Sequence, residues 1–110
     1  MIRILKKNSE FKAIYSDNYR IVGKYFVFLI HNQESDILRA GIVCSKKVGI
    51  AVIRNKIRRR VKAFFRENYK EINFSRDIIL IARKDCASAS WQQIVQDLSI
   101  NINKIKQYLA

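Results

Sequence analysis

The sequence predicts one α+β domain, in which helices pack on a small mixed sheet. Three segments rich in apolar and β-branched residues predict strands, and two apolar patterns at helical spacing predict long helices. A chain of 110 residues is long enough for one hydrophobic core and too short for two, so residues 1–110 form a single domain. The expected order is α-β-β-α-β-α, which belongs to the α+β class.

The first helix is expected over residues 9–16. Residues 8–10 offer a cap, and Phe11, Ile14 and Tyr15 share one helix face through their i, i+3 and i+4 spacing. A turn is expected at Asp17 and Asn18, before the first strand begins.

The three expected strands cover residues 25–31, 37–44 and 77–83. The second strand is expected to be the antiparallel partner of the first. The third is apolar enough to be buried on both faces. Alternation along the first strand predicts two faces, one with Phe26, Phe28 and Ile30 and the other with Tyr25, Val27, Leu29 and His31.

The last helix is expected to begin at a capping box made by Ser90 and Gln93. After it, apolar residues recur at helical spacing, as expected of a face packed in the core: Trp91, Ile94, Val95, Leu98, Ile102, Ile105 and Leu109.

The composition points to a polyanionic partner. Lys and Arg number 22 against 9 acidic residues, so the net charge is +13 and the pI is about 10.2, while a hydrophobic fraction of 49% excludes a disordered basic tail. Nucleic acid is the leading partner and an anionic membrane surface a distant second. The longest apolar run, residues 25–30, is far shorter than a membrane span, and residues 1–7 contain no secretory signal, so a cytoplasmic protein is expected.

Catalytic and metal-binding patterns are not found in the sequence. Cys44 and Cys86 form no CxxC pair and the chain has one histidine, which argues against zinc; free buried thiols are favoured over a lone disulfide. The chain shows no Ser/His/Asp set, no paired carboxylates and no phosphate-cradling glycine loop. We therefore expect no catalytic residue and no metal ligand in the polypeptide.

The most specific segment is residues 45–67, in which every charged residue before Glu67 is positive. At about 100° per residue, one helix face collects the apolar residues Ile53, Ile57, Val61, Phe64 and Phe65. Arg54 emerges in the first turn, Arg60 lies near the border of this face, and the opposite arc carries Asn55, Lys56, Arg58, Arg59, Lys62 and Arg66.

A helix face that is merely solvated usually mixes signs, because like charges repel across one turn. Most of the cations here are arginines, whose planar forks suit phosphate oxygens. A membrane-surface helix would also be basic, but its apolar face would have to be free, and so small a domain needs that face for its core. The segment therefore predicts a phosphate-binding surface.

Residues 45–59, SKKVGIAVIRNKIRR, resemble the motif S-K-K-x-G-x-A-V-x-R-N-R-x-K-R of bacterial ribonuclease P proteins. Residues 8–15 are similar to the family's opening N-x-x-F-x-x-V-F helix, and residues 77–84, DIILIARK, to its third strand. The resemblance covers nearly the whole chain in the right order. It implies a fold of the ribosomal S5 second-domain type with a left-handed β-α-β crossover, against the usual right-handed rule.

The resemblance also implies a function. The catalytic RNA subunit would hydrolyse precursor tRNA with Mg²⁺ that it holds mainly itself, and the protein would bind that RNA and the 5′ leader of the precursor. The RNA-facing residues would be Arg54, Asn55, Lys56, Arg58 and Arg59, with Lys46, Lys47, Lys62 and Arg66 in support. The leader cleft would be lined by Phe11 and Tyr15 opposite Val27 and Leu29.

Among the positions that depart from the family pattern, three concern the expected RNA and leader contacts. Lys56 replaces an arginine, which keeps the charge but loses a bidentate fork. Arg60 stands where an apolar residue is commoner, so it either adds an RNA contact or extends its chain along the core. Leu29 stands where relatives can carry an aromatic residue.

Three other functions compete with this one. A ribosomal-type RNA-binding protein would share the charge and the fold but take no part in cleavage. A DNA-binding protein would need a helix-turn-helix partner or a dimer, which the flanking strands argue against. An autonomous nuclease would need carboxylate or histidine clusters for its metal ions.

Overall fold

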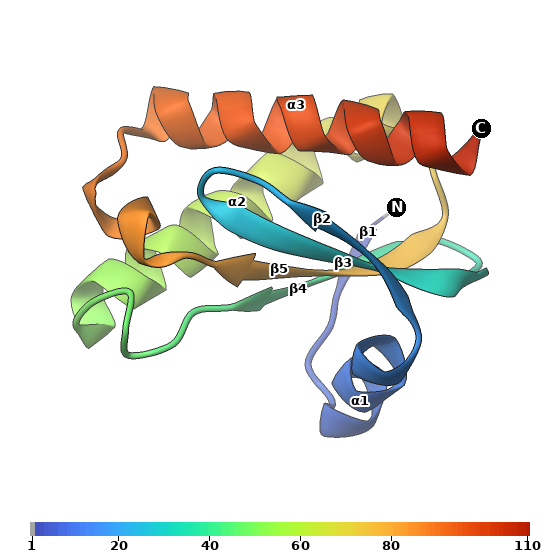
Figure 1. Cartoon of the computed structure of the whole chain (residues 1–110), viewed down its shortest axis with the longest axis horizontal. Helices are drawn as coiled ribbons and strands as arrows, with labels where there is room; N and C mark the ends of the chain where they lie inside the picture. Colours follow the sequence, from blue (N-terminus) through green and yellow to red (C-terminus); the bar gives the residue numbers. More distant parts are fainter. Residues whose placement is uncertain (1) are drawn as a thin grey trace.

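The computed structural model describes residues 2–110 and confirms the α+β class, with a five-stranded mixed sheet and helices on both faces (Figure 1). In chain order the elements are β1 (Ile2–Ile4), α1 (Asn8–Ser16), β2 (Asn18–Val22), β3 (Phe26–Glu34), β4 (Leu38–Val43), α2 (Ala51–Ile72), β5 (Arg76–Ala82), the 3-10 helix η1 (Lys84–Ser88) and α3 (Trp91–Leu109). Within this part of the chain, no helix is both long and apolar enough to cross a membrane.

Two edge strands add to the expected order. β1 pairs in parallel with β4, and β2 pairs antiparallel with β3. β2 begins at Asn18, where a turn was expected; the Asn18 Nδ2 donates to the carbonyl of Ile14 (2.9 Å) and so closes α1 as the strand begins. Both strands are short and carry an arginine, Arg3 or Arg20, so neither shows a continuous apolar run.

The antiparallel pairing expected between the first two predicted strands, which correspond to β3 and β4, is wrong. The sheet order is β1-β4-β5-β3-β2, so β5 lies between them, antiparallel to β3 and parallel to β4. β5 has its Ile78, Ile79 and Leu80 fully buried, and the centre of the sheet is where both faces of a strand are covered. The left-handed sense of the β4-α2-β5 connection stays a prediction.

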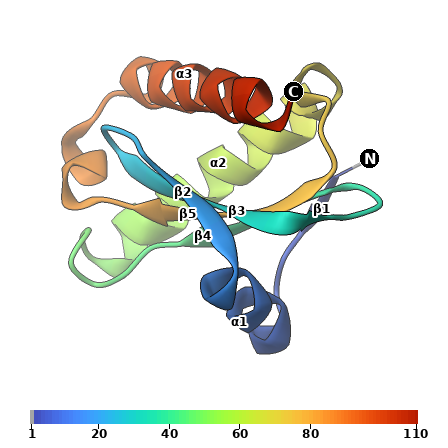
Figure 2. The same ribbon diagram turned by 45° about the vertical axis from the view of Figure 1, so that its right-hand side comes forward.

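The sheet separates two hydrophobic cores. α2 and α3 cover one face, where the larger core includes Phe26, Phe28 and Ile30 as the alternation predicted. α1 covers the other face, as the turned view shows (Figure 2), and closes a smaller core over Leu29 and Ile79. Tyr25 was expected on the α1 face, but it precedes β3 and joins the larger core.

The capping box of α3 is confirmed. The Oγ of Ser90 accepts from the backbone N–H of Gln93 (3.1 Å), and the Oε1 of Gln93 accepts from the backbone N–H of Ser90 (2.9 Å). These bonds fix the start of α3 directly after η1.

Candidate nucleic-acid interface

Helix α2 divides into a buried face and a cationic face. The predicted apolar face is confirmed, because Ile57, Val61, Phe64 and Phe65 are buried and Ile53 packs against them. The other face forms what we call the cationic ridge: Arg54, Asn55, Lys56, Arg58, Arg59, Lys62 and Arg66. Asn55, Lys56, Arg59 and Arg66 are exposed, and the remaining three are half-buried. The loop before α2 adds the exposed Lys46 and Lys47.

The two half-buried arginines of the ridge, Arg58 and Arg54, differ in their hydrogen bonds. Arg58 donates through Nη2 to the carbonyl of Cys44 (3.0 Å) and through Nη1 to the Oδ1 of Asn55 (3.3 Å), so its guanidinium joins α2 to the end of β4. The Nε of Arg54 is buried and has no hydrogen-bond acceptor among residues 2–110. A buried donor without an acceptor is unfavourable, so this position of Arg54 carries a cost in stability.

Both cysteines beneath this region are free and buried, as expected. Burial raises the pKa of the Cys44 thiol, although the positive charges of Arg58 and Arg54 act in the opposite direction. Burial likewise raises the pKa of Cys86 to about 12. Both thiols are therefore neutral at neutral pH and contribute no negative charge beneath the ridge.

Arg60 does not join the cationic ridge. Its guanidinium lies 5.6 Å from the centre of the Trp91 ring, over the border between α2 and α3. A cation at this distance over an indole face is attracted by the ring quadrupole. The side chain thus runs along the core and places its charge at the border, which is one of the two roles expected for it.

A second surface lies on the other face of the sheet, beside α1. Cross-strand neighbours Val22, Val27, Ile81 and Val43 form a continuous row across β2, β3, β5 and β4. Val22 is 54% exposed and the other three are half-buried, so this row is only partly covered. We call it the apolar floor.

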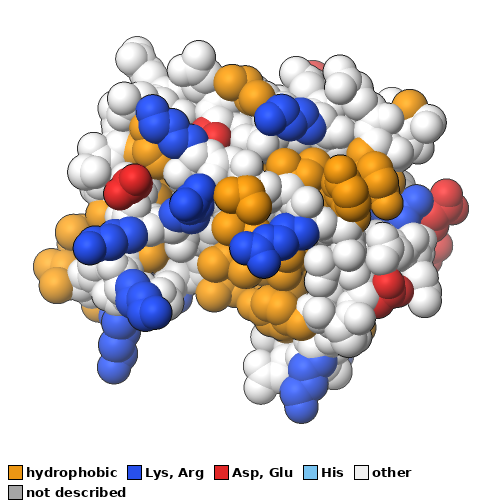
Figure 3. Space-filling view, viewed as in Figure 1, with side chains coloured by type: hydrophobic (Ala, Val, Ile, Leu, Met, Phe, Trp, Pro, Cys, Tyr) orange, Lys and Arg blue, Asp and Glu red, His pale blue; other side chains and the backbone are white. Residues whose placement is uncertain are grey.

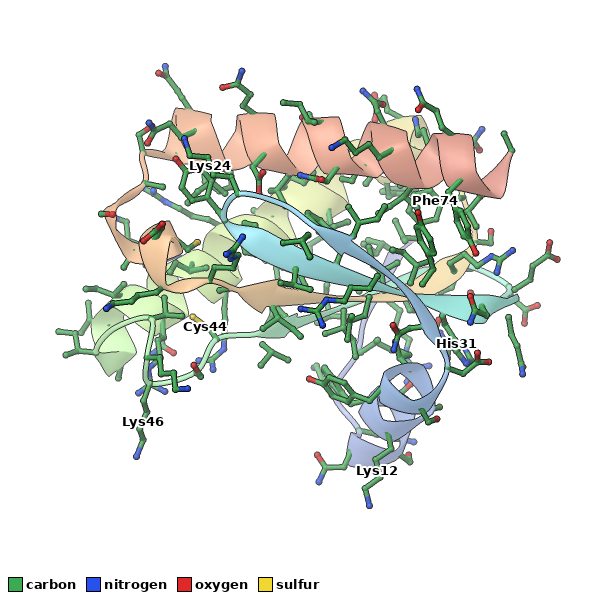
Figure 4. The ribbon with its side chains drawn as sticks, viewed as in Figure 1. Lys12, Lys24, His31, Cys44, Lys46 and Phe74 are labelled. Atoms are coloured by element: carbon green, nitrogen blue, oxygen red, sulfur yellow. The ribbon has the colours of Figure 1, made fainter. Side chains whose placement is uncertain are left out.

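Figure 3 shows where this face is hollowed. Hydrophobic side chains gather between the lobe made by α1 and the lobe made by the β4–α2 loop. In the same view, Lys12 on α1 and Lys46 on that loop project from the two lobes (Figure 4). The hollow therefore combines an apolar base with positive charge on both sides.

The expected leader-cleft residues all lie at this face but differ in exposure. The Phe11 ring is half-buried and lies over the backbone of Gly41, where an added Cβ would come within 2.6 Å of the ring. Leu29 is only 7% exposed beneath α1, whereas Val27 belongs to the apolar floor. Tyr15 is 47% exposed. Tyr15 and Val27 are thus open to a ligand, while Phe11 and Leu29 also hold α1 on the sheet.

Sequence reasoning missed three members of the apolar floor, Val22, Val43 and Ile81. The alternation of β5 places Ile79 and Ile81 on one face, but only the strand pairing shows that this is the α1 face. Arg20 lies beside Leu29 in the next cross-strand row and is exposed, so it adds a cation to the rim.

Ion pairs fix α1 against the sheet. Arg39 donates through Nε and Nη2 to the two carboxylate oxygens of Asp77, each at 2.6 Å, and this bond raises the pKa of Arg39. The Oε2 of Glu10 accepts from Arg3 (2.7 Å) and lies 3.7 Å from Arg39. These arginines already have carboxylate partners. Across residues 2–110, no three His, Cys, Asp or Glu side chains cluster in a way that could hold a metal ion.

A comparison with models of protein families identifies the family to which this chain belongs. The family model for ribonuclease P matches residues 2–106. The chain belongs to the ribonuclease P protein family. A ribonuclease P protein component from Mycoplasma mycoides is 36% identical over 107 residues, which cover 94% of this chain and 96% of the relative. One from Halalkalibacterium halodurans is 32% identical over 91 residues, covering 82% and 76%.

Solved structures of the family share the fold. The ribonuclease P protein of Staphylococcus aureus superposes with a TM-score of 0.82 at 36% identity, covering 94% of each chain. The ribonuclease P protein of Thermotoga maritima superposes with a TM-score of 0.82 at 28% identity, covering 93% of this chain and 96% of the other. The family resemblance noted in residues 45–59 therefore extends to the whole architecture.

Proposed function

We propose that this chain is the protein subunit of a cytoplasmic ribonuclease P ribonucleoprotein, which matures the 5′ ends of tRNAs. The observation that carries this proposal is the cationic ridge, which has no acidic residue and belongs to a member of the family. An RNA backbone laid along the ridge would meet the exposed Arg59 and Arg66, whose guanidinium groups suit phosphate oxygens.

The apolar floor supplies the second half of the proposal. Single-stranded nucleic acid binds where bases stack on apolar or aromatic groups and cations follow the backbone. The floor, the exposed Tyr15 and the flanking Lys12 and Lys46 offer this combination. We assign this hollow to the 5′ leader of precursor tRNA, and the opposite side of the sheet, with the ridge, to the catalytic RNA.

Catalysis is assigned to the RNA subunit, which would hold the Mg²⁺ ions. The polypeptide would contribute binding, by neutralising phosphates on the ridge and by positioning the leader. The test is reconstitution with a cognate catalytic RNA at low Mg²⁺, where the protein should stimulate cleavage of precursor tRNA. Protein freed of RNA should cleave nothing in Mg²⁺ or Mn²⁺; cleavage by such a preparation would contradict this assignment.

The leader site has its own test. Tyr15→Ala changes an exposed side chain, so the fold should persist. The free energy of binding precursor tRNA to the reconstituted complex should become less favourable by about 1–3 kcal/mol, the value of one lost base stack. Affinity for mature tRNA, which has no leader, should not change. An equal loss for precursor and mature tRNA would remove Tyr15 from the leader site. A ribosomal-type protein would stimulate no cleavage in the reconstitution experiment.

A further inference from the structure

A small cavity lies between α2, η1 and α3, on the opposite side of the sheet from the apolar floor. Its volume is about 110 Å³. One water molecule requires roughly 10–15 Å³ measured in the same way, and drug-sized sites begin near roughly 300 Å³, so the cavity suits a group between these two sizes. The residues lining it are Ile53, Lys56, Ile57, Arg60, Val61, Cys86, Ala87, Ala89, Trp91 and Ile94.

The charges around the cavity are positive. Lys56 and Arg60 line it, and no acidic residue does. Cys86 is buried in its wall, and desolvation, with smaller contributions from Cys44 and Asp97, raises the pKa of its thiol to about 12. The cavity therefore presents an apolar interior with cations and no anion, which suits a group that is flat and uncharged at one end and anionic at the other.

Arg60 and Trp91, which both line the cavity, form a cation–π pair beside it. The guanidinium lies over the ring at 5.6 Å from its centre, and Trp91 is only half-buried. A nucleobase could take the ring face that the guanidinium covers, while the guanidinium turns to the phosphate of the same nucleotide. This exchange replaces a cation–π contact with a base stack and a charge-assisted hydrogen bond.

The cavity is continuous with the cationic ridge. Lys56 is exposed on the ridge and also lines the cavity, one helical turn before Arg60. A backbone that follows the ridge would therefore pass the mouth of the cavity. A leader bound on the apolar floor would lie on the other face of the sheet.

We propose that this cavity binds one unpaired nucleotide of the catalytic RNA, with the base against Trp91 and the phosphate held by Lys56 and Arg60. The proposal rests on the proposed function, since it names the part of the RNA subunit that meets the border of α2 and α3.

Trp91 gives a direct measurement, because it is the only tryptophan in the chain. The protein is titrated with the cognate RNA subunit while tryptophan emission and, separately, binding are recorded. Stacking of a base should quench the emission at saturation and protect the indole from acrylamide. A short single-stranded oligonucleotide with the leader sequence should bind without this quenching.

Two variants test the contacts. Ala87→Leu places a larger side chain in the lining from an exposed position, so the fold should persist. It should abolish the quenching and weaken RNA binding by roughly five- to 160-fold, the range for one base stack. Arg60→Leu should lower the salt slope of binding by roughly 0.7–0.9, one phosphate contact. The matched control is Ala13→Leu, the same exchange at an exposed position of α1, which should change neither measurement.

The outcomes separate this proposal from the proposed function. If the RNA subunit binds tightly and stimulates cleavage but Trp91 emission and acrylamide protection are unchanged, the cavity proposal is overturned and the proposed function stands. The cavity proposal would also be overturned if the leader oligonucleotide, without the RNA subunit, quenched the emission of Trp91. If the RNA subunit does not bind at all, both proposals fail. Should Ala87→Leu not fold, the wild-type titration and Arg60→Leu still decide the result.

Discussion

Phe11 and Gly41 show how one missing side chain positions a whole helix. The ring of Phe11 lies where a Cβ on Gly41 would come within 2.6 Å of its Cζ and 2.7 Å of its Cε1. The same Cβ would lie 3.3 Å from the Cβ of Leu5. The glycine has an ordinary backbone conformation, so it is required for space rather than for flexibility. α1 can approach the sheet this closely because β4 carries no side chain at that point.

Gly41→Ala should therefore push the Phe11 ring out of its place and destabilise the protein. Overpacking of this kind costs about 1–3 kcal/mol in the free energy of unfolding, which urea unfolding can measure. Adding Phe11→Leu should restore part of the loss, because the smaller side chain leaves room for the new methyl group. If Gly41→Ala is as stable as the wild type, the close contact is not present in solution.

Cys44 and Cys86 should be unreactive in the folded protein. Burial is the main cause that raises both thiol pKa values, that of Cys86 to about 12 from its usual 9.0, so thiolate is scarce at pH 8. Ellman's reagent should react slowly with native protein and quickly with two thiols in urea. Because the folded-state pKa is raised, the associated stability is present below pH 9 and declines as the pH rises toward 12. Fast reaction of the native protein at pH 8 would contradict this burial.

At the scale of elements, α2 combines two opposed requirements. Its apolar face is needed by the core, and its other face gathers like charges that repel one another across each turn. The first turn of α2 has no acidic residue to balance the helix dipole, and the cap at Ile50 makes no side-chain hydrogen bond. Packing against the sheet, rather than local helix preference, must therefore hold this segment helical.

Arg59→Ala combined with Arg66→Ala should separate binding from stability. Both side chains are exposed, so RNA affinity should fall strongly while the melting temperature stays the same or rises slightly as repulsion is relieved. The salt slope of binding should fall by roughly 0.7–0.9 for each lost phosphate contact. Arg58 is unsuitable for this test because its bond to the Cys44 carbonyl is structural.

The matched control replaces two exposed cations outside α2, Lys24→Ala with Lys104→Ala, and removes the same net charge. It should reduce RNA affinity much less. Equal losses for the two double variants would mean that total charge, and not the ridge, governs binding.

The elements differ in how far the sequence could predict them. α2 and α3 were predictable because their apolar spacing and the Ser90 capping box are local signals. β1 and β2 were missed because each is a short edge strand whose pattern is interrupted by an arginine. The pairing of β3 with β5 joins segments about fifty residues apart, and no local pattern reports such a partner.

The same division applies to the candidate interface. The cationic ridge lies on one helix, so spacing along the sequence was enough to predict that an apolar face and a cationic face share α2. The apolar floor takes one residue from each of four strands. Ile81 connects Val43 to Val27 because β5 lies between β4 and β3 and pairs with both. Phe11 could be assigned to the α1 face by its spacing, but its contact with Gly41 depends on the tertiary structure.

For the whole molecule, a net charge of +13 on 110 residues should make stability depend on salt. Charges of one sign repel in the compact state, and added ions screen them over about 10 Å at 0.1 M. The melting temperature should therefore rise as NaCl is increased from low concentration, and rise further with a polyanion such as heparin, which binds the folded state. A melting temperature that falls with added NaCl would show that attractive ion pairs, such as Arg39 with Asp77, outweigh the repulsion.

The central position of β5 has a consequence for synthesis. During translation, β3 and β4 leave the ribosome well before β5, and α2 must follow β4 before the strand that pairs with both is made. Until residues 76–82 have emerged, each of these two apolar strands has an edge without a partner. The nascent chain therefore completes its sheet late, and a chain interrupted after α2 would expose two open edges prone to aggregation.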